Sequence, residues 1–440
     1  MALPHAPTLA TVVRVILHHL PLKFQRSRLN GPRQSLLILL AIIQSGVDRI
    51  GVRSARLEVM KRLDAALGWS AVHIPSTSAV CRALRKLKPE LLETLLSLAK
   101  VEVTNIYGKN LLIHGYRVVA IDGCRMNAMR TSTLAGWLGL PKQAGKRKAQ
   151  QPQALVVVAR CIVTGIVLAQ EIVKHSGSER DCARRLMSSL SDVGPLLVLL
   201  DRGFPARDLI GLMHELQIKF IVRMCGGKRT WRELRDLAVG TAKDVKVPLK
   251  IRSGLGRWCT TEMRMILSDR ISMGRPKSDR TPERMILVTN LTGKYWKTQR
   301  IIAMYHRRWD IETSFREDKR LLGATRSRAT TQNGFRNELL ALQIYRIIMA
   351  LIAAQVIADA KRQRWDDLRA IRCTTTQLIA IAWWLAEMAM VNPQRCQEKL
   401  ESLVAEIIRD SARKRPGRSY KRICKGVEGV WKKKLDRCYR

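Results

Sequence analysis

The sequence predicts an α/β fold, in which a mixed sheet is covered by helices and flanked by helical regions at both ends. Hydrophobic residues make up 46% of the 440-residue chain but aromatic residues only 5%. The core therefore depends on aliphatic side chains, which suits helices packed on a sheet. The central part alternates short β-branched runs with amphipathic segments. Two of its apolar runs are followed directly by an aspartate, as at a ligand-binding edge of an open sheet.

The charge of the chain predicts a polyanionic partner. Its 79 Lys and Arg residues outnumber 36 Asp and Glu residues, which gives a formal net charge of +43. Such an excess attracts nucleic acid irrespective of its sequence. The longest uncharged runs, Ser35–Val47 and Ile347–Ala358, are shorter than the roughly 20 residues that a membrane span needs. We therefore expect no membrane partner, no signal peptide and a cytoplasmic protein.

Cysteine and histidine do not form a metal site in this sequence. The ten cysteines are scattered, with no CxxC pair, and the eight histidines form no cluster. We expect reduced thiols and no structural zinc. Metal chemistry would have to depend on carboxylates.

Residues 1–110 are predicted to be helical and to contact DNA. Helices are expected at Ser35–Ser45, Ala79–Leu87 and Pro89–Val103, the second with an N-cap supplied by residues 75–78. Residues 76–103 could form a helix-turn-helix. Its basic side chains would be Arg82, Arg85, Lys86 and Lys88. A helical pair with a solvated basic face is the alternative.

Residues 111–224 are predicted to form the first part of the core. Short β-branched runs indicate strands, and Ser178 can cap the first helix. The expected elements are strands Val118–Ile121, Leu155–Ile162 and Ile166–Val173, helix Glu179–Leu190, strand Leu196–Leu200, helix Ala206–Leu216 and strand Phe220–Met224. The order β-β-β-α-β-α-β predicts a mixed sheet covered by helices.

The remaining chain divides into three predicted regions. Residues 225–295 form a β-rich insertion, 296–335 the second part of the core, and 336–440 a helical region with a basic tail. The expected elements are strands Val245–Ile251, Cys259–Leu267 and Met285–Leu291, then helices Thr298–Leu322, Asn337–Ala360 and Thr376–Met390. Residues 411–440 hold twelve Lys and Arg against two acids, which fits either a solvated tail or phosphate contact.

Two aspartates are candidate site residues. Asp122 and Asp201 each follow an apolar run that is read as a buried strand, and each precedes turn residues. The carboxyl ends of strands in an open α/β sheet border the ligand crevice. Each aspartate alone could equally end a strand or cap a helix, but the shared layout favours a site.

A third acid is predicted on the helix Thr298–Leu322. Tyr305, Arg308, Glu312 and Lys319 are spaced by three, four and seven residues, so on a continuous helix they share an arc of about 60°. An adjacent apolar stripe would face the sheet. That stripe comprises Met304, Ile311, Phe315 and Leu322, whereas Asp310, Glu317 and Asp318 point elsewhere. We therefore select Glu312, with an i,i+4 surface pair to Arg308 as the alternative.

These residues resemble a known family. The pattern Y-x2-R-x3-E-x6-K at Tyr305, Arg308, Glu312 and Lys319 is similar to the YREK signature of DDE transposases of bacterial insertion sequences (insertion-sequence family four). The surroundings are similar too: Asp122-Gly123, Ser178-Glu179, Asp201-Arg202-Gly203-Phe204, Val288-Thr289-Asn290-Leu291 and Arg415–Tyr420. The likeness covers residues 117–420, and Cys124 stands where the family often has Thr.

The resemblance implies a ribonuclease H-like catalytic core with a β-rich insertion before the helix that carries the glutamate. It implies metal-dependent cleavage of transposon ends and 3′-hydroxyl strand transfer into target DNA, of the cut-and-paste type. Asp122, Asp201 and Glu312 would be catalytic and hold two Mg²⁺ ions, for which Mn²⁺ would substitute. The implied phosphate-binding residues are Tyr305, Arg308, Lys319 and Arg202.

The implied partners are double-stranded DNA, as terminal inverted repeats and target, and a second copy of the chain in a DNA-bound dimer. The implied location is the nucleoid of a bacterial cytoplasm. Two alternatives stay open: a catalytically silent DNA-binding protein derived from a transposase, and a ribonuclease H-like nuclease without strand transfer.

Overall fold

A computed structural model describes the central part of the chain. It covers residues 86–362, with gaps at 142–150, 191–192, 226–230, 236, 238–242, 254–255, 272–283 and 321–326, and a few isolated positions outside that range. The helices expected at Ser35–Ser45 and Thr376–Met390 lie outside the described residues. So do the basic tail and part of the proposed helix-turn-helix, of which the structure describes residues 86–103 and two isolated positions; the helix expected at Pro89–Val103 is present.

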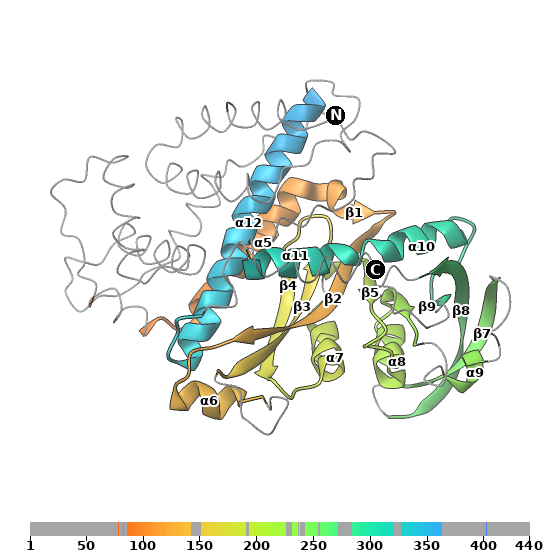
Figure 1. The fold of residues 1–440 in the computed structure, drawn as a ribbon. Coiled ribbons are helices and arrows are strands. Elements are labelled where there is room, and N and C mark those ends of the chain that lie inside the picture. Colours follow the sequence, from red (N-terminus) through yellow and green to blue (C-terminus); the bar gives the residue numbers. More distant parts are fainter. Residues whose placement is uncertain are drawn as a thin grey trace, which may run out of the picture.

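One mixed sheet organises the described residues (Figure 1). Its strands are β1 (Leu112–Ile113), β2 (Tyr116–Asn127), β3 (Gln153–Cys161), β4 (Val167–Lys174), β5 (Leu196–Leu200), β6 (Lys219–Arg223), β7 (Lys243–Arg252), β8 (Trp258–Ile271) and β9 (Arg284–Thr289). The order across the sheet is β4-β3-β2-β5-β6-β9-β8-β7, with β1 paired to β2. β2 pairs antiparallel with β3 and parallel with β5, and β5 pairs parallel with β6.

Helices cover both faces of this sheet. They are α5 (Pro89–Tyr107), α6 (Ser132–Leu138), α7 (Glu179–Leu190), α8 (Arg207–Glu215), α9 (Arg232–Arg235), α10 (Thr298–His306), α11 (Trp309–Arg320) and α12 (Gln332–Arg362), with a 3-10 turn, η2, at Gly108–Leu111. α7 and α8 pack on one face, and α6, α10 and α11 pack on the other. The predicted order β-β-β-α-β-α-β is confirmed by β2, β3, β4, α7, β5, α8 and β6. The predicted mixed sheet covered by helices is thereby confirmed.

Side-chain alternation in β2 explains why both faces are covered. Val119 and Ile121 are buried with α7 and α8, whereas Val118 and Ala120 are buried with α10 and α11. Successive side chains of a strand point to opposite faces, so an unbroken apolar run buries both. The run Leu196–Leu200 of β5 is likewise fully buried.

Ser and Thr residues begin three of the helices in the same way. The hydroxyl of Ser178 accepts a hydrogen bond from the Asp181 amide at 3.2 Å, which confirms the predicted cap of α7. Thr131 caps α6 and Thr331 caps α12, each from an amide three residues on. Such caps satisfy amides that have no partner within the helix.

Three details of the prediction were wrong. β2 does not end before Asp122 but continues to Asn127, because β3 keeps pairing with it after β5 has ended. Helix α6 was missed. The single helix expected at Thr298–Leu322 is two helices, because hydrogen bonds between residues three apart form a tighter turn at Arg307 and Arg308.

The strands expected between residues 225 and 295 are present as β7, β8 and β9. They extend the main sheet, because β9 pairs antiparallel with β6 and β8 pairs with β9. On the opposite side of the molecule, α5 packs along α12, where the Tyr107 hydroxyl donates to the Ala350 carbonyl at 2.7 Å. Within the described residues, no helix combines the length and apolar character needed to cross a membrane.

Candidate active site

The register of the sheet brings Asp122 and Asp201 together. β2 and β5 run parallel with Ile121 opposite Leu200, the last pair between these strands. The two aspartates follow that pair directly, one on each strand. β2 continues beyond this point while β5 ends, so the acids lie where the sheet opens between neighbouring strands.

Alternation also decides which face of the sheet the two acids share. The residues two positions earlier, Ala120 and Leu199, are both buried on the face covered by α10 and α11. Because strand side chains repeat with a period of two, Asp122 and Asp201 belong to that same face. The acids therefore lie toward the two helices on which Tyr305 and Glu312 stand.

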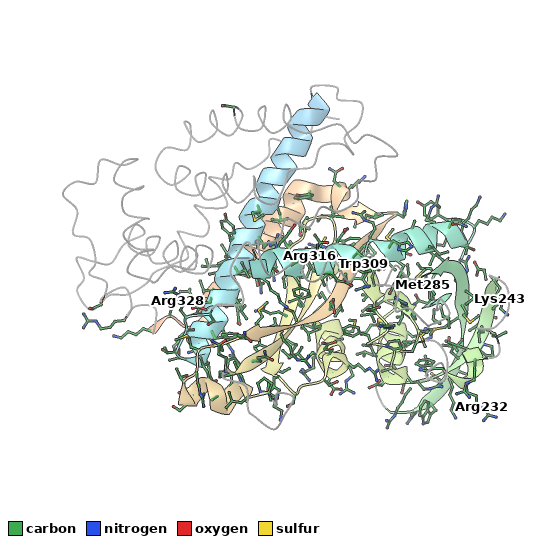
Figure 2. The ribbon with its side chains drawn as sticks, viewed as in Figure 1. Arg232, Lys243, Met285, Trp309, Arg316 and Arg328 are labelled. Carbon is green, nitrogen blue, oxygen red and sulfur yellow. The ribbon has the colours of Figure 1, made fainter. Side chains whose placement is uncertain are left out.

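Arg308 connects the three predicted acids. Its guanidinium lies 4.0 Å from Asp122, 3.8 Å from Asp201 and 2.6 Å from Glu312, measured between nitrogen and oxygen. The Arg308 side chain is only 3% exposed, whereas the acids are 22–32% exposed. Arg308 stands in the turn between α10 and α11, beside the half-exposed Trp309 (Figure 2). The turn thus directs a buried cation at three acids from three different elements.

Two nitrogens of Arg308 have no hydrogen-bond partner. Nε and Nη1 are buried and make no hydrogen bond within the described part of the chain, although Nη1 lies 4.0 Å from Asp122. Burial opposes the charge of Arg308, but Asp201, Tyr305 and Glu312 more than offset it, so its pKa stays above the ordinary value. A charged guanidinium whose N–H groups are not all hydrogen-bonded can bind an additional anionic ligand beside these partly exposed carboxylates.

Tyr305 orients one of the acids. The side chain is 3% exposed, and its hydroxyl donates to Oδ1 of Asp201 at 3.2 Å. Burial, together with the charge of Asp201, raises the pKa of Tyr305. The tyrosine is therefore a neutral donor to the carboxylate; its expected contact with phosphate stays a prediction.

Asp122 is held in an unusual electrostatic state. Burial raises its pKa to about 6, with repulsion from Glu179 and Asp201 adding to the rise, while the Gly123 amide and Arg308 oppose it. The Gly123 amide donates to Oδ1 of Asp122 at 2.8 Å. A carboxylate with a raised pKa among other acids is typical of functional sites, because such crowding disfavours the free ionised form.

Glu179 is a fourth acid at this site that the sequence reading noted only as the start of a helix. A Cβ atom added to Gly123 would lie 2.6 Å from its Oε1 atom. Gly123 lies one position after Asp122 in β2 and so faces α7, at whose first residue Glu179 stands. The glycine leaves room for the carboxylate next to Asp122. In the sequence, the position of Gly123 directly after Asp122 was the only signal for its contact with Glu179.

Two further predicted residues, Lys319 and Arg202, stand on the same segments of the chain as Glu312 and Asp201. Lys319 lies beside the buried thiol of Cys124, whose pKa is raised by burial and lowered by this ammonium. Arg202 is exposed directly after Asp201, and its carbonyl accepts a hydrogen bond from the Cys225 thiol. Their predicted phosphate contacts stay predictions.

The acids suit a divalent cation by chemistry. Carboxylate oxygens are hard ligands of the kind that Mg²⁺ prefers. As placed here, however, no group of three acidic, His or Cys side chains in the described ranges could hold a metal ion. The guanidinium of Arg308 lies among the acids instead. The donor set fits a metal, and pairing with Arg308 competes with it.

Comparison with known proteins identifies the family of this chain. The family described as "Transposase DDE domain" matches residues 113–348, more than half of the chain. The chain belongs to this family of transposases. The matched residues include Asp122, Asp201 and Glu312.

Two further comparisons add little to this assignment. No curated protein matches the chain. A solved structure, the cryo-EM piggyBac transposase synaptic complex with hairpin DNA, is similar at 11% identity and a TM-score of 0.42, covering 95% of this chain and 85% of that chain. A likeness at this level supports no functional inference.

Proposed function

We propose that this protein is a DNA transposase of the YREK branch, with Asp122, Asp201 and Glu312 as its catalytic carboxylates. The observation that carries the proposal is the convergence of these acids, from β2, the end of β5 and α11, on the guanidinium of Arg308. The reaction is cleavage of transposon ends followed by attack of the freed 3′-hydroxyl on target DNA.

The three acids would hold two Mg²⁺ ions, with Mn²⁺ as a substitute. Such ions activate an oxygen nucleophile and stabilise the leaving oxygen of the phosphodiester. Tyr305 holds Asp201 by its hydroxyl, and Gly123 holds Asp122 by its amide. These bonds fix one oxygen of each aspartate and leave the other available as a ligand.

The cationic residues of the site would bind the phosphates of the cleaved strand. Arg308 has two buried nitrogens that make no hydrogen bond within the described residues, and a guanidinium matches the geometry of phosphate oxygens. Lys319 and the exposed Arg202 border the same acids and would add further contacts to the phosphates. Arg308 would thus leave the acids for the phosphate when the metal is bound.

The substrate would be double-stranded DNA, both at the transposon ends and at the target. The net charge of +43 supports such a partner, since sequence-independent affinity for DNA follows from phosphate neutralisation. A dimer would bring two ends together. The half-exposed Trp309 and the basic turn around Arg308 lie where the strand would pass.

A nuclease without strand transfer would use the same acids. The two activities are separated by the products: a transposase joins the cleaved 3′ end to a second duplex, and a nuclease does not. A catalytically inactive DNA-binding protein derived from a transposase would cleave neither duplex. The sequence feature that favours this alternative is Cys124, which departs from the family pattern.

The test is cleavage of a duplex taken from the DNA that flanks the gene. Asp201→Ala should lower Mg²⁺-dependent cleavage by roughly a thousandfold or more, because several kcal/mol of metal-borne stabilisation are lost and each 1.4 kcal/mol is about tenfold. Asp208→Ala is the matched control, since Asp208 is an exposed aspartate of α8 that pairs with Arg184 on the surface. An Asp201→Ala protein as active as this control would overturn the assignment.

A further inference from the structure

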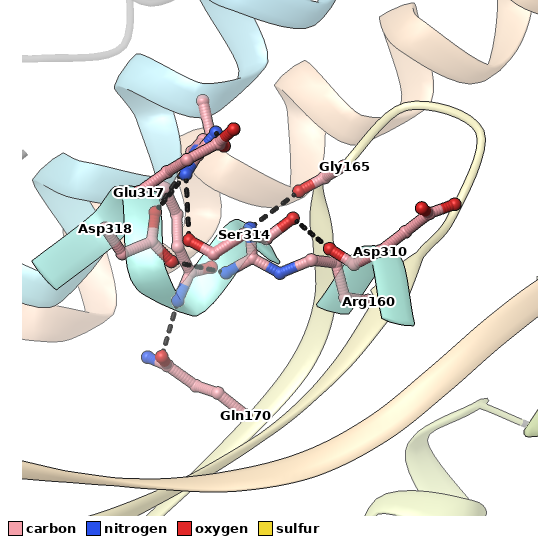
Figure 3. A network of polar contacts seen from close by, with 9 residues as sticks. Arg160, Gly165, Gln170, Asp310, Ser314, Glu317 and Asp318 are labelled. Atoms are coloured by element: carbon pink, nitrogen blue, oxygen red, sulfur yellow. Dashed lines mark hydrogen bonds and ion pairs between the residues drawn. The ribbon is translucent and has the colours of Figure 1, made fainter. Parts of the chain in front are cut away.

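A second cluster of charged residues lies on the other side of α11 (Figure 3). Asp318 is buried, and each of its oxygens accepts from a different arginine. Arg160 of β3 donates to Oδ2 at 2.6 Å, and Nε of Arg346 of α12 donates to Oδ1 at 2.8 Å. We call Arg160, Asp318 and Arg346 the buried clamp. The clamp joins α11 to the sheet and to α12 at a single carboxylate.

Further bonds extend the clamp along α11. Arg346 also donates to Glu317 at 3.0 Å and to the Ser314 carbonyl at 3.2 Å. Arg160 also donates to the Gly165 carbonyl at 3.0 Å, and its guanidinium lies 5.7 Å from the ring centre of Phe315. Four residues of α11, namely Ser314, Phe315, Glu317 and Asp318, thereby contact two arginines that belong to other elements.

Stability alone does not explain such a cluster. Taking charges out of water is unfavourable, and well-packed apolar side chains of similar volume often stabilise a protein as well as a buried ion pair does. Apolar contacts, however, allow a helix to rotate or slide. Directional bonds to both oxygens of one carboxylate define a single rotation of the helix.

The rotation of α11 matters because Glu312 stands on it. α11 begins at Trp309, directly after the turn that separates it from α10, so α10 does not fix its rotation through a continuous helix. A rotation by one residue, about 100°, would carry Glu312 away from Arg308. Lys319, which follows Asp318 directly, would leave Cys124 and the acids in the same movement.

We propose that Arg160, Asp318 and Arg346 are positioning residues, which fix the rotation of α11 and so hold Glu312 and Lys319 at the acids. The proposal rests on the catalytic role of Glu312 proposed above. It also ties the site to α12, which packs along α5, so that the helical region flanking the core sets the orientation of the third acid.

The first test replaces Asp318 by Asn in the full chain. Cleavage of the flanking-DNA duplex is followed in single turnovers over a range of Mg²⁺ concentrations. We expect the half-saturating Mg²⁺ concentration to rise by about tenfold or more, as for residues that orient metal ligands, with activity partly restored at high Mg²⁺. Asp310→Asn, an exposed acid of the same helix, is the control and should match the unaltered protein. An unchanged Mg²⁺ dependence with only a smaller active fraction would mean a merely structural role and overturn the proposal.

The second test does not depend on cleavage. Amide hydrogen exchange of residues 309–320 should become faster in Asp318→Asn, while β2 and β5 exchange as before. If the unaltered protein cleaves nothing, the proposed function fails, but this exchange still tests the clamp. Exchange of α11 like that of the unaltered protein would overturn it.

A milder variant covers the case in which Asp318→Asn does not fold. Arg346→Lys keeps the positive charge but loses the planar fork that bonds Asp318, Glu317 and the Ser314 carbonyl together. We expect a smaller rise in the half-saturating Mg²⁺ concentration and faster exchange of α11. Both quantities unchanged in a folded Arg346→Lys protein would contradict the proposal.

Discussion

The two faces of α11 carry charged clusters of opposite design. Toward Asp122 and Asp201, three carboxylates share the single guanidinium of Arg308, at 2.6–4.0 Å, and the acids are partly exposed. On the other face, the carboxylate of Asp318 in the buried clamp and that of the neighbouring Glu317 meet two guanidiniums at 2.6–3.0 Å. The first cluster has an excess of negative charge, whereas the second is balanced.

This difference separates binding from positioning. A balanced, buried cluster has no charge left for a ligand, and its short bonds define one geometry. An unbalanced cluster at an exposed edge attracts a cation and can change partners. On one short helix, Glu312 belongs to the first kind and Asp318 to the second. Substitution of Glu312 should therefore affect catalysis with little loss of stability, whereas substitution of Asp318 should lower stability and act on catalysis only through the position of α11.

The largest expected effect is on catalysis at Glu312. Glu312→Gln keeps the shape of the side chain but removes the charge, so cleavage in single turnovers should fall by roughly a thousandfold. The free energy of unfolding should change by less than about 1 kcal/mol, because the side chain is 32% exposed and such pairs contribute little. Urea denaturation measures the second quantity. Cleavage within tenfold of the unaltered protein would place Glu312 outside the site.

The next effect is on stability at Asp318. Asp318→Asn leaves the guanidiniums of Arg160 and Arg346 buried without their shared carboxylate. The free energy of unfolding should fall by about 3 kcal/mol, the usual consequence of breaking a buried ion pair. Asp310→Asn should change it by less than about 1 kcal/mol, since its side chain is 54% exposed. Equal losses in the two variants would remove the distinction between the clusters.

A smaller expected effect is that the charge of the first cluster, but not that of the buried clamp, changes with pH near 6. Burial raises the pKa of Asp122 to about 6, above its ordinary value of 3.8. Below about pH 6 the protonated acid cannot act as an anionic ligand, so thermal stabilisation by Mg²⁺ should be present above pH 6 and decline as the pH falls through it. Burial alone would raise the pKa of Asp318, but Arg160 and Arg346 hold it below the usual range. The clamp should therefore keep its charge throughout this window.

Melting temperatures with and without Mg²⁺ between pH 5 and pH 8 measure this dependence. Asp122→Asn should lose both the Mg²⁺ stabilisation and its pH step. In the absence of metal, a raised pKa of an acid opposes folding once the acid ionises, so Asp122 should lower the stability of the unaltered protein as the pH rises from 4 toward 6. A Mg²⁺ effect independent of pH would argue against Asp122 as a ligand.

The fold was largely predictable because its signals are local. An unbroken apolar run identified β5 at its true bounds, and the cap at Ser178 identified α7. The extent of β2 was not predictable, because its continuation through Asp122 depends on pairing with β3, a distant segment. The break of the long helix at Arg308 escaped for a similar reason: nothing local marks a turn that places a buried arginine against acids on other strands.

The sequence predicted which three acids would lie together, but not the geometry in which they meet. Spacing selected Glu312 over Asp318, and the structure does place them on different faces of α11. The sequence predicted only that Asp318 points away from the polar stripe, because nothing in the sequence indicates that Arg160 and Arg346 bind its carboxylate. Arg308 was assigned to phosphate, with an i,i+4 pair to Glu312 as the alternative, and that pair is present. Its contact with all three acids arises from tertiary packing.

The smallest expected effect concerns Glu179, which adds a further negative charge to the cluster of Asp122, Asp201 and Glu312. Glu179→Gln removes repulsion from Asp122, so the pKa of Asp122 should fall. The pH at which Mg²⁺ stabilisation is half lost should fall with it. Gly123→Ala tests the same contact from the other side. A new Cβ would lie 2.6 Å from Oε1 of Glu179 and displace that flexible side chain.

Both variants should therefore shift the pH midpoint in the same direction. A Glu179 that only stabilised the start of α7, as acids at helix N-termini do, would give a different result. Glu179→Gln, and Gly123→Ala by displacing the same carboxylate, would then lower the melting temperature without moving the midpoint. Because a helix-end effect and a like-charge effect differ in which quantity moves, the pair of variants decides whether Glu179 belongs to the site.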